Sequence, residues 1–172
     1  MRVPERIHFF SFTTGVSLEL PVGFTGGENA DGAVYVHRDD EVPDAVVIVT
    51  VVGSAPPGAG ADRDAAGVLV DAMATTAAEV LQRGQQDIDD ERVFVAVLRF
   101  PHGLPAGGAA TPGHPELAGL LEADVLVLFA AVGFDGRVVA ITAAAPSELA
   151  GHYRTVFEQA LSSCRFIAGV PA

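Results

Sequence analysis

Two long apolar runs joined by an Asp-Gly pair constrain the fold of this chain more than any other feature. Residues 125–134 (VLVLFAAVGF) and 137–144 (RVVAITAA) flank Asp135 and Gly136. Such a pair is a strong short-range signal for a tight β-hairpin, because glycine readily adopts the positive φ that the turn requires. Both runs are apolar at nearly every position, so we expect both faces of the hairpin to be covered. This requires at least three layers.

A helix is predicted directly after the hairpin. Pro146 suits the first helical position, and Ser147 and Glu148 favour the positive end of a helix dipole. Apolar residues then recur at helical spacing. They are Leu149, Tyr153, Val156, Phe157, Ala160, Leu161 and Cys164. We expect this helix to cover one face of the hairpin.

The first third of the chain predicts several strands. Residues 24–32 carry three glycines and the only asparagine, so they are interpreted as a loop, and residues 39–44 as an acidic turn. Residues 45–52 are β-branched or apolar almost throughout, which is typical of a central strand. The predicted strands in this region are 7–12, 16–20, 33–38 and 45–52.

The middle of the chain predicts a second helix, a strand and a long loop. Asp62 is a suitable N-cap for a helix that runs to about Arg83 and stops at Gly84. Its apolar side would consist of Leu69, Met73, Ala77, Val80 and Leu81. Residues 92–100 read as a strand, and residues 101–115 hold four prolines and four glycines, too many for regular structure.

This element order predicts an α+β fold in a single domain spanning residues 1–172. A chain of 172 residues is long enough for one hydrophobic core. Consecutive strands are joined by short turns, which indicates a mainly antiparallel sheet. We expect helices to pack on both faces of that sheet.

Several short segments resemble the PsbP-like superfamily, which includes Mog-type Ran-binding factors, LpqN-type lipoproteins and Eag-type secretion chaperones. They are the opening GVSLELPVGF of residues 15–24, the FDGR hairpin of residues 134–137 and the closing FEQALSSCRF of residues 157–166. The resemblance implies an α/β/α sandwich that binds other proteins, with no shared catalytic residues to assign here.

Composition narrows the possible partners and the compartment. The formal charge is −12, which repels phosphate backbones, so nucleic acid is not an expected partner. The chain has no lysine, which removes Walker-type phosphate loops and Schiff-base chemistry. No apolar run reaches the roughly 20 residues of a membrane span, and the start lacks the apolar region of a signal peptide. We therefore expect a cytoplasmic protein without a membrane span.

The candidate catalytic and metal-binding residues all have simpler interpretations. His37 and Asp39 share the spacing of some iron ligands, but neither belongs to a recognised motif. Asp87 to Glu91 imitates the start of a calcium loop, yet Arg92 stands where that loop needs glycine. Cys164 falls on the apolar face of the closing helix, as an inert buried thiol does. We predict no catalytic residue, no metal site and no cofactor.

The leading functional hypothesis is a non-catalytic module that binds another protein, such as an adaptor or a secretion-linked chaperone. Its predicted contact residues are His102, Leu104 and His114 in the loop 101–115, where no core role is evident. The alternative is a carrier of small molecules or lipid, with a pocket between sheet and helix. That pocket would be lined by Phe94, Phe129, Met73 and Phe157.

Overall fold

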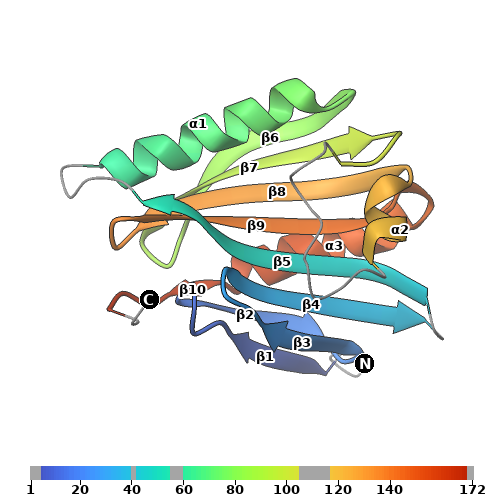
Figure 1. Cartoon of the computed structure of the whole chain (residues 1–172), viewed down its shortest axis with the longest axis horizontal. Helices are drawn as coiled ribbons and strands as arrows, with labels where there is room; N and C mark the ends of the chain where they lie inside the picture. Colours follow the sequence, from blue (N-terminus) through green and yellow to red (C-terminus); the bar gives the residue numbers. More distant parts are fainter. Residues whose placement is uncertain (1–4, 40–41, 55–59, 105–116, 170–172) are drawn as a thin grey trace.

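The computed structural model describes residues 5–39, 42–54, 60–104 and 117–169 (Figure 1). Helices are α1 (Ala61–Thr76), α2 (Leu117–Glu122) and α3 (Ala150–Ser162), and a 3-10 turn at Ser147–Leu149 precedes α3. The strands are β1 (Arg6–Phe10), β2 (Val16–Pro21), β3 (Phe24–Glu28), β4 (Gly32–Asp39), β5 (Val42–Ser54), β6 (Glu79–Ile88), β7 (Glu91–Phe100), β8 (Val125–Phe134), β9 (Arg137–Pro146) and β10 (Arg165–Phe166).

The strands form two antiparallel sheets. The large sheet has the order β3-β4-β5-β9-β8-β7-β6, and the small one has the order β1-β2-β10. Figure 1 shows the small sheet below the end of the large sheet that carries β3 and β4. The mainly antiparallel α+β architecture is confirmed, and β5 is an interior strand as predicted.

The central hairpin forms where the sequence predicts it. Asp135 and Gly136 have φ angles of 55° and 70°, the two consecutive positive values of a type I′ turn. Phe134 pairs with Arg137, and every residue of β8 is buried. The turn is anchored to α1, because the Gly136 amide donates to Asp62 Oδ2 at 3.2 Å.

The side chains of β8 alternate between two apolar clusters. Val125, Val127 and Phe129 belong to a cluster that includes Ala66, Val70 and Ala74 of α1. Leu126, Leu128 and Ala130 belong to a second cluster that includes Tyr153, Phe157 and Leu161 of α3, with Leu18 and Leu20 of β2. The large sheet thus contributes to apolar packing through both of its faces.

The predicted helix from Asp62 to Arg83 is wrong in its second half. α1 ends at Thr76, and residues 79–88 form strand β6, in which Val80 and Leu81 are exposed. The apolar spacing of this segment is typical of a helix. Pairing with β7 instead satisfies backbone hydrogen bonds along the strand, and this tertiary interaction outweighs the local helix preference. The helix also begins one residue before Asp62, with Gly60 as its N-cap at φ 81°.

The predicted loop at residues 24–32 contains strand β3. Gly26 reflects close packing, since a Cβ there would lie 2.3 Å from the Tyr35 ring. Only the turn after the strand is irregular. There the Asn29 side chain accepts hydrogen bonds from the amides of Asp31 and Gly32, each at 2.9 Å.

The closing helix begins later than predicted. Pro146 is the last residue of β9, and Leu149 lies in the 3-10 turn with 38% of its surface exposed. Tyr153, Phe157 and the other predicted apolar positions up to Leu161 are buried, as expected. Cys164 is buried as well, although it lies beyond the helix end.

The four residues predicted to line one carrier pocket do not meet. Met73, Phe94 and Phe129 belong to the cluster of α1, whereas Phe157 belongs to the cluster of α3. These clusters take alternate residues of the same strand, so the sheet separates them. No described helix is long and apolar enough to span a bilayer.

Candidate functional site

Strand β6 is an exposed edge of the large sheet. Among the described strands it pairs only with β7, and nine of its ten residues are exposed, Ile88 being the exception. Two of the exposed residues, Val80 and Leu81, are apolar. Within the described ranges, no backbone hydrogen bond outside the sheet ladder involves residues 79–88. One side of this backbone is therefore open to another chain.

A groove of about 430 Å³ lies between β6 and α3. Its apolar side chains are Val95 and Val97 of β7, Leu128 of β8 and Leu161 of α3, and its polar residues are Gln82, Gln85, Gln86, Glu158 and Ser162, with Gly84 among them. The register of the hairpin explains the lining. Gln82 and Gly84 pair with Val97 and Val95, so they share one face of the sheet with those valines.

Gly84 leaves the middle of the groove open. A Cβ at this position would meet no heavy atom within 4 Å. Its cross-strand neighbour Val95 is only partly buried, since Gly84 has no side chain to cover it. Glycine weakens a strand and often marks the place where a ligand or another backbone approaches closely.

The charges around this groove are paired. All three charged residues of β6 have partners of opposite sign: Glu79 with Arg99, Arg83 with Asp71 of α1, and Asp87 with Arg92. On the α3 side, Arg154 Nε donates to Glu158 at 3.2 Å, and Arg154 Nη2 donates to Gln82 Oε1 at 2.5 Å. The groove is therefore polar at its rim without an excess of either charge, although the whole chain carries −12.

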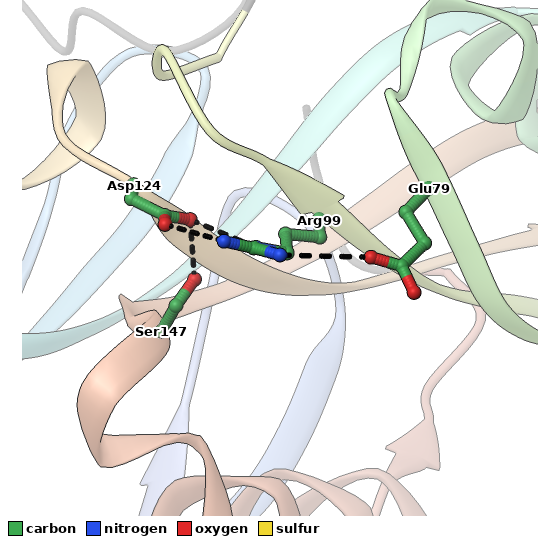
Figure 2. A network of polar contacts seen from close by, with 4 residues as sticks. All are labelled: Glu79, Arg99, Asp124 and Ser147. Atoms are coloured by element: carbon green, nitrogen blue, oxygen red, sulfur yellow. Dashed lines mark hydrogen bonds and ion pairs between the residues drawn. The ribbon is translucent and has the colours of Figure 1, made fainter.

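A network of four polar residues fixes one end of β6 (Figure 2). Arg99 of β7 donates from Nε and Nη2 to the Asp124 carboxylate at 3.2 and 2.8 Å, and its Nη1 lies 3.7 Å from Glu79 Oε2. Ser147 Oγ donates to Asp124 Oδ1 at 2.6 Å. The hydrogen bonds from Arg99 and then from Ser147 lower the pKa of Asp124 to about 2. This Arg99 network holds together the ends of β6, β7, β8 and β9.

The predicted partner-binding residues lie partly beside this network. His102 is exposed and lies two residues beyond the end of β7, the strand that carries Arg99. Leu104 is partly buried against the cluster of α1, so the prediction that it lacks a core role is wrong. His114 lies outside the described residues. The structure thus places His102 just after β7 and gives Leu104 a packing role.

His37 belongs to a second polar cluster, which joins β4, β5 and α3. His37 Nδ1 lies 2.7 Å from Asp44 Oδ1, and Tyr153 donates its hydroxyl to Asp44 Oδ2 at 2.7 Å. The other edge of the ring packs on the backbone, because a Cβ at Gly23 would lie 2.7 Å from His37 Nε2. These contacts give the cluster a role in joining elements, with His37 Nδ1 held between Asp44 and the Tyr153 hydroxyl.

The remaining candidate residues also have structural surroundings. Cys164 is fully buried, and burial raises the pKa of its thiol to about 12. Asp89, at the turn between β6 and β7, accepts a hydrogen bond from the Phe166 amide at 2.9 Å. In the described part of the chain, no group of three or more His, Cys, Asp or Glu side chains is arranged to hold a metal ion.

The sequence matches no family model and no curated protein. Several solved structures nevertheless share the fold over almost the whole chain. Cyanobacterial PsbP (CyanoP) of Synechocystis sp. PCC 6803 has 13% identity and a TM-score of 0.57, with 97% of this chain and 95% of that one covered. The fold is PsbP-like. The predicted resemblance is confirmed at the level of fold.

Two further structures share this PsbP-like fold. The Ran-binding protein Mog1p of Saccharomyces cerevisiae has 14% identity and a TM-score of 0.55, with 96% and 97% of the two chains covered. The protein PA94 of Pseudomonas aeruginosa has 10% identity and a TM-score of 0.51, with 98% and 99% covered. The structural similarity shows that this chain shares the PsbP-like fold. At identities of 10–14%, it shows the fold alone.

Sequence reasoning missed the groove of this PsbP-like chain, because it placed residues 79–83 in a helix. Two signals could have revealed β6. Thr75 and Thr76 are β-branched residues that favour a helix end, and Asp89-Asp90 separates residues 79–88 from an obvious strand. Asp89 and Asp90 adopt φ angles of 51° and 65°. Two consecutive positive φ angles also occur at Asp135 and Gly136 in the central hairpin turn.

Proposed function

We propose that this chain is a small, non-catalytic protein-binding module, acting in the cytoplasm as an adaptor or a secretion-linked chaperone. We also propose that it forms a single domain in which helices pack on both faces of the sheet. The observation that carries the proposal is the open edge of β6 beside the Gly84 groove. The shared fold with Mog1p, which is named for binding Ran, supports a protein as the partner.

The described polar clusters support a role without catalysis. In the Arg99 network the Asp124 carboxylate is held by Arg99 and Ser147, and in the second cluster His37 and Tyr153 share Asp44. A general acid or base needs a proton-transfer atom directed at a substrate position, and a nucleophile needs such a base beside it. Both clusters instead direct their polar atoms at one another.

The loop after β7 belongs to the proposed partner surface. His102 follows the end of β7, and Arg99 of the same strand pairs with the first residue of β6. We propose that His102 and His114 contact the partner, and that Leu104 anchors the start of the loop against the core. Replacing residues 105–114 with a short Gly-Ser linker, together with His102→Ser, removes both histidines and keeps Leu104. This variant should keep its melting temperature within a few degrees, because loop closure depends weakly on length. Partner capture should be lost, and capture that survives would place the contact elsewhere.

A carrier of small apolar molecules is the second candidate, favoured by the apolar side of the groove. Native mass spectrometry of the purified chain separates the two functions. A binding module should show the mass of the chain alone, whereas a carrier should retain bound lipid or metabolite through purification. A retained small molecule that fills the groove would replace the protein-binding proposal.

Affinity capture from a lysate of the source cell tests the proposal itself. The immobilised chain should retain a partner protein. Its binding should be saturable, and an excess of the free chain in solution should prevent it. An unrelated domain of similar size and charge serves as the control for non-specific retention. Nuclease treatment should leave the capture unchanged, since a net charge of −12 opposes binding through nucleic acid. If no protein is retained above this control, the proposed function is wrong.

A further inference from the structure

We propose that β6 takes up an uncharged, extended segment of the partner protein as an additional strand, and that this segment places a bulky apolar side chain over Gly84. This inference rests on the proposed protein-binding function. It specifies the surface, the conformation of the bound segment and the chemistry of its central side chain.

The two edges of the large sheet differ in how they are covered. At the β3 edge, the segment before β2 is tied to the strand, since the Phe12 amide and the Thr13 hydroxyl both donate to Glu28 at 2.9 Å. The ten-residue β6 has no comparable cover among the described residues. Proteins normally protect an edge with proline, charged side chains, a β-bulge or another element, because an open edge is a template for pairing. β6 contains no proline, its register shift at Val80–Gln82 lies near its start, and its three charged side chains are engaged by Arg99, Asp71 and Arg92.

The groove defines what the added strand should carry. A strand beside β6 would place alternate side chains on the face shared by Gln82 and Gly84. On that face, the partly buried Val95 lies beside Gly84, with Leu128 and Leu161 also lining the groove. An apolar side chain over Gly84 would cover these groups and release water from them. Edge pairing combined with a pocket for alternate side chains is a known mode of peptide recognition.

The charges favour an uncharged segment from a different protein. A charged side chain entering the groove would find Arg154 already paired with Glu158, and every charge of β6 already paired. The glutamines of the rim offer neutral donors and acceptors instead. A second copy of the chain fits less well, because it would bring another −12 of charge and a β6 with three charged residues.

Selection from a displayed library of random twelve-residue peptides tests this inference. The matched variants are Gly84→Leu and Gly27→Leu, since each glycine lies in an edge strand and a Cβ at either meets no atom within 4 Å. Leu at position 84 fills the groove, and Leu at position 27 adds the same side chain to β3. Both variants should melt close to the original chain, which verifies that they fold.

Enriched peptides should be uncharged and alternate apolar with polar residues. They should bind the original chain and Gly27→Leu equally, and Gly84→Leu at least tenfold more weakly. N-methylation of the alternate amides that face β6 should remove binding, because it deletes the donors of the added strand.

Four outcomes would overturn the inference: no enrichment, enrichment of charged or helix-patterned peptides, equal binding to Gly84→Leu, or no effect of N-methylation. A dimer in sedimentation experiments that Gly84→Leu dissociates would assign β6 to a second copy instead. If peptide selection fails while lysate capture succeeds, the partner binds at another surface. If both fail, the proposed function fails with the inference.

Discussion

Phe157 should contribute more to stability than almost any other single side chain of α3. It is 1% exposed, stacks on Tyr153 with ring centroids 5.7 Å apart, and lies in the cluster between α3 and the large sheet. Replacing a buried phenylalanine with alanine removes its burial and leaves a cavity, at a cost of about 3 to 5 kcal/mol. With a urea dependence of ~2 kcal/mol per molar, the unfolding midpoint should fall by roughly 1.5 to 2.5 M.

The assay is equilibrium unfolding in urea, followed by circular dichroism, for Phe157→Ala, Phe157→Leu and Phe12→Ala. Phe157→Leu leaves a smaller cavity and should show an intermediate loss, so a graded series is expected even if the alanine variant is barely folded. Phe12 is 68% exposed, and its removal should cost less than about 1 kcal/mol. An unchanged midpoint for Phe157→Ala would refute the packing of α3 on the sheet.

Three further predictions concern the turn, the Arg99 network and the thiol. Gly136→Val should destabilise the chain by about 1 to 2 kcal/mol, because a β-branched residue is strained at φ 70°, and Gly136→Asn should cost less; equal urea midpoints for the two variants would contradict this. The pKa of Asp124 lies below its usual 3.8, so the contribution of the network is present above about pH 4 and is lost as the pH falls through about 2. The gap in urea midpoint between the original chain and Arg99→Gln should therefore narrow from pH 4 to pH 2, and a gap that stays constant over this range would show that the ion pair is not its source. Because burial raises the pKa of Cys164 to about 12, maleimide should label the thiol only after unfolding, and rapid labelling of the folded chain at pH 8 would show that the thiol is accessible.

The local chemistry of the sequence determined the parts of this fold that depend on neighbouring residues. The Asp135-Gly136 turn and the continuous apolar runs around it predicted β8 and β9, because turn type and burial on both faces are recorded in short segments. The spacing of Tyr153, Phe157 and Leu161 predicted the buried face of α3 for the same reason.

Only the tertiary structure decided the identity of β6 and β3. Val80 and Leu81 continue an apolar helical pattern that begins in α1, and the β-branched Thr75 and Thr76 disfavour the longer helix without forbidding it. The alternative is chosen because β7 supplies a partner for the entire segment. At β3, Gly26 resembles a loop residue until the ring of Tyr35, nine residues away, occupies the space above it.

The candidate site lies wholly in this second category. Gly84 is a possible helix stop in the sequence and becomes the opening of a groove only when β6, β7, β8 and α3 are brought together. Likewise, Arg99 contacts Glu79 on the neighbouring strand and Asp124 between α2 and β8. Such contacts join residues 20 or more positions apart, so short-range periodicity carries no record of them. The sequence determined which segments must be buried, whereas the pairing of distant strands determined which edge stayed open.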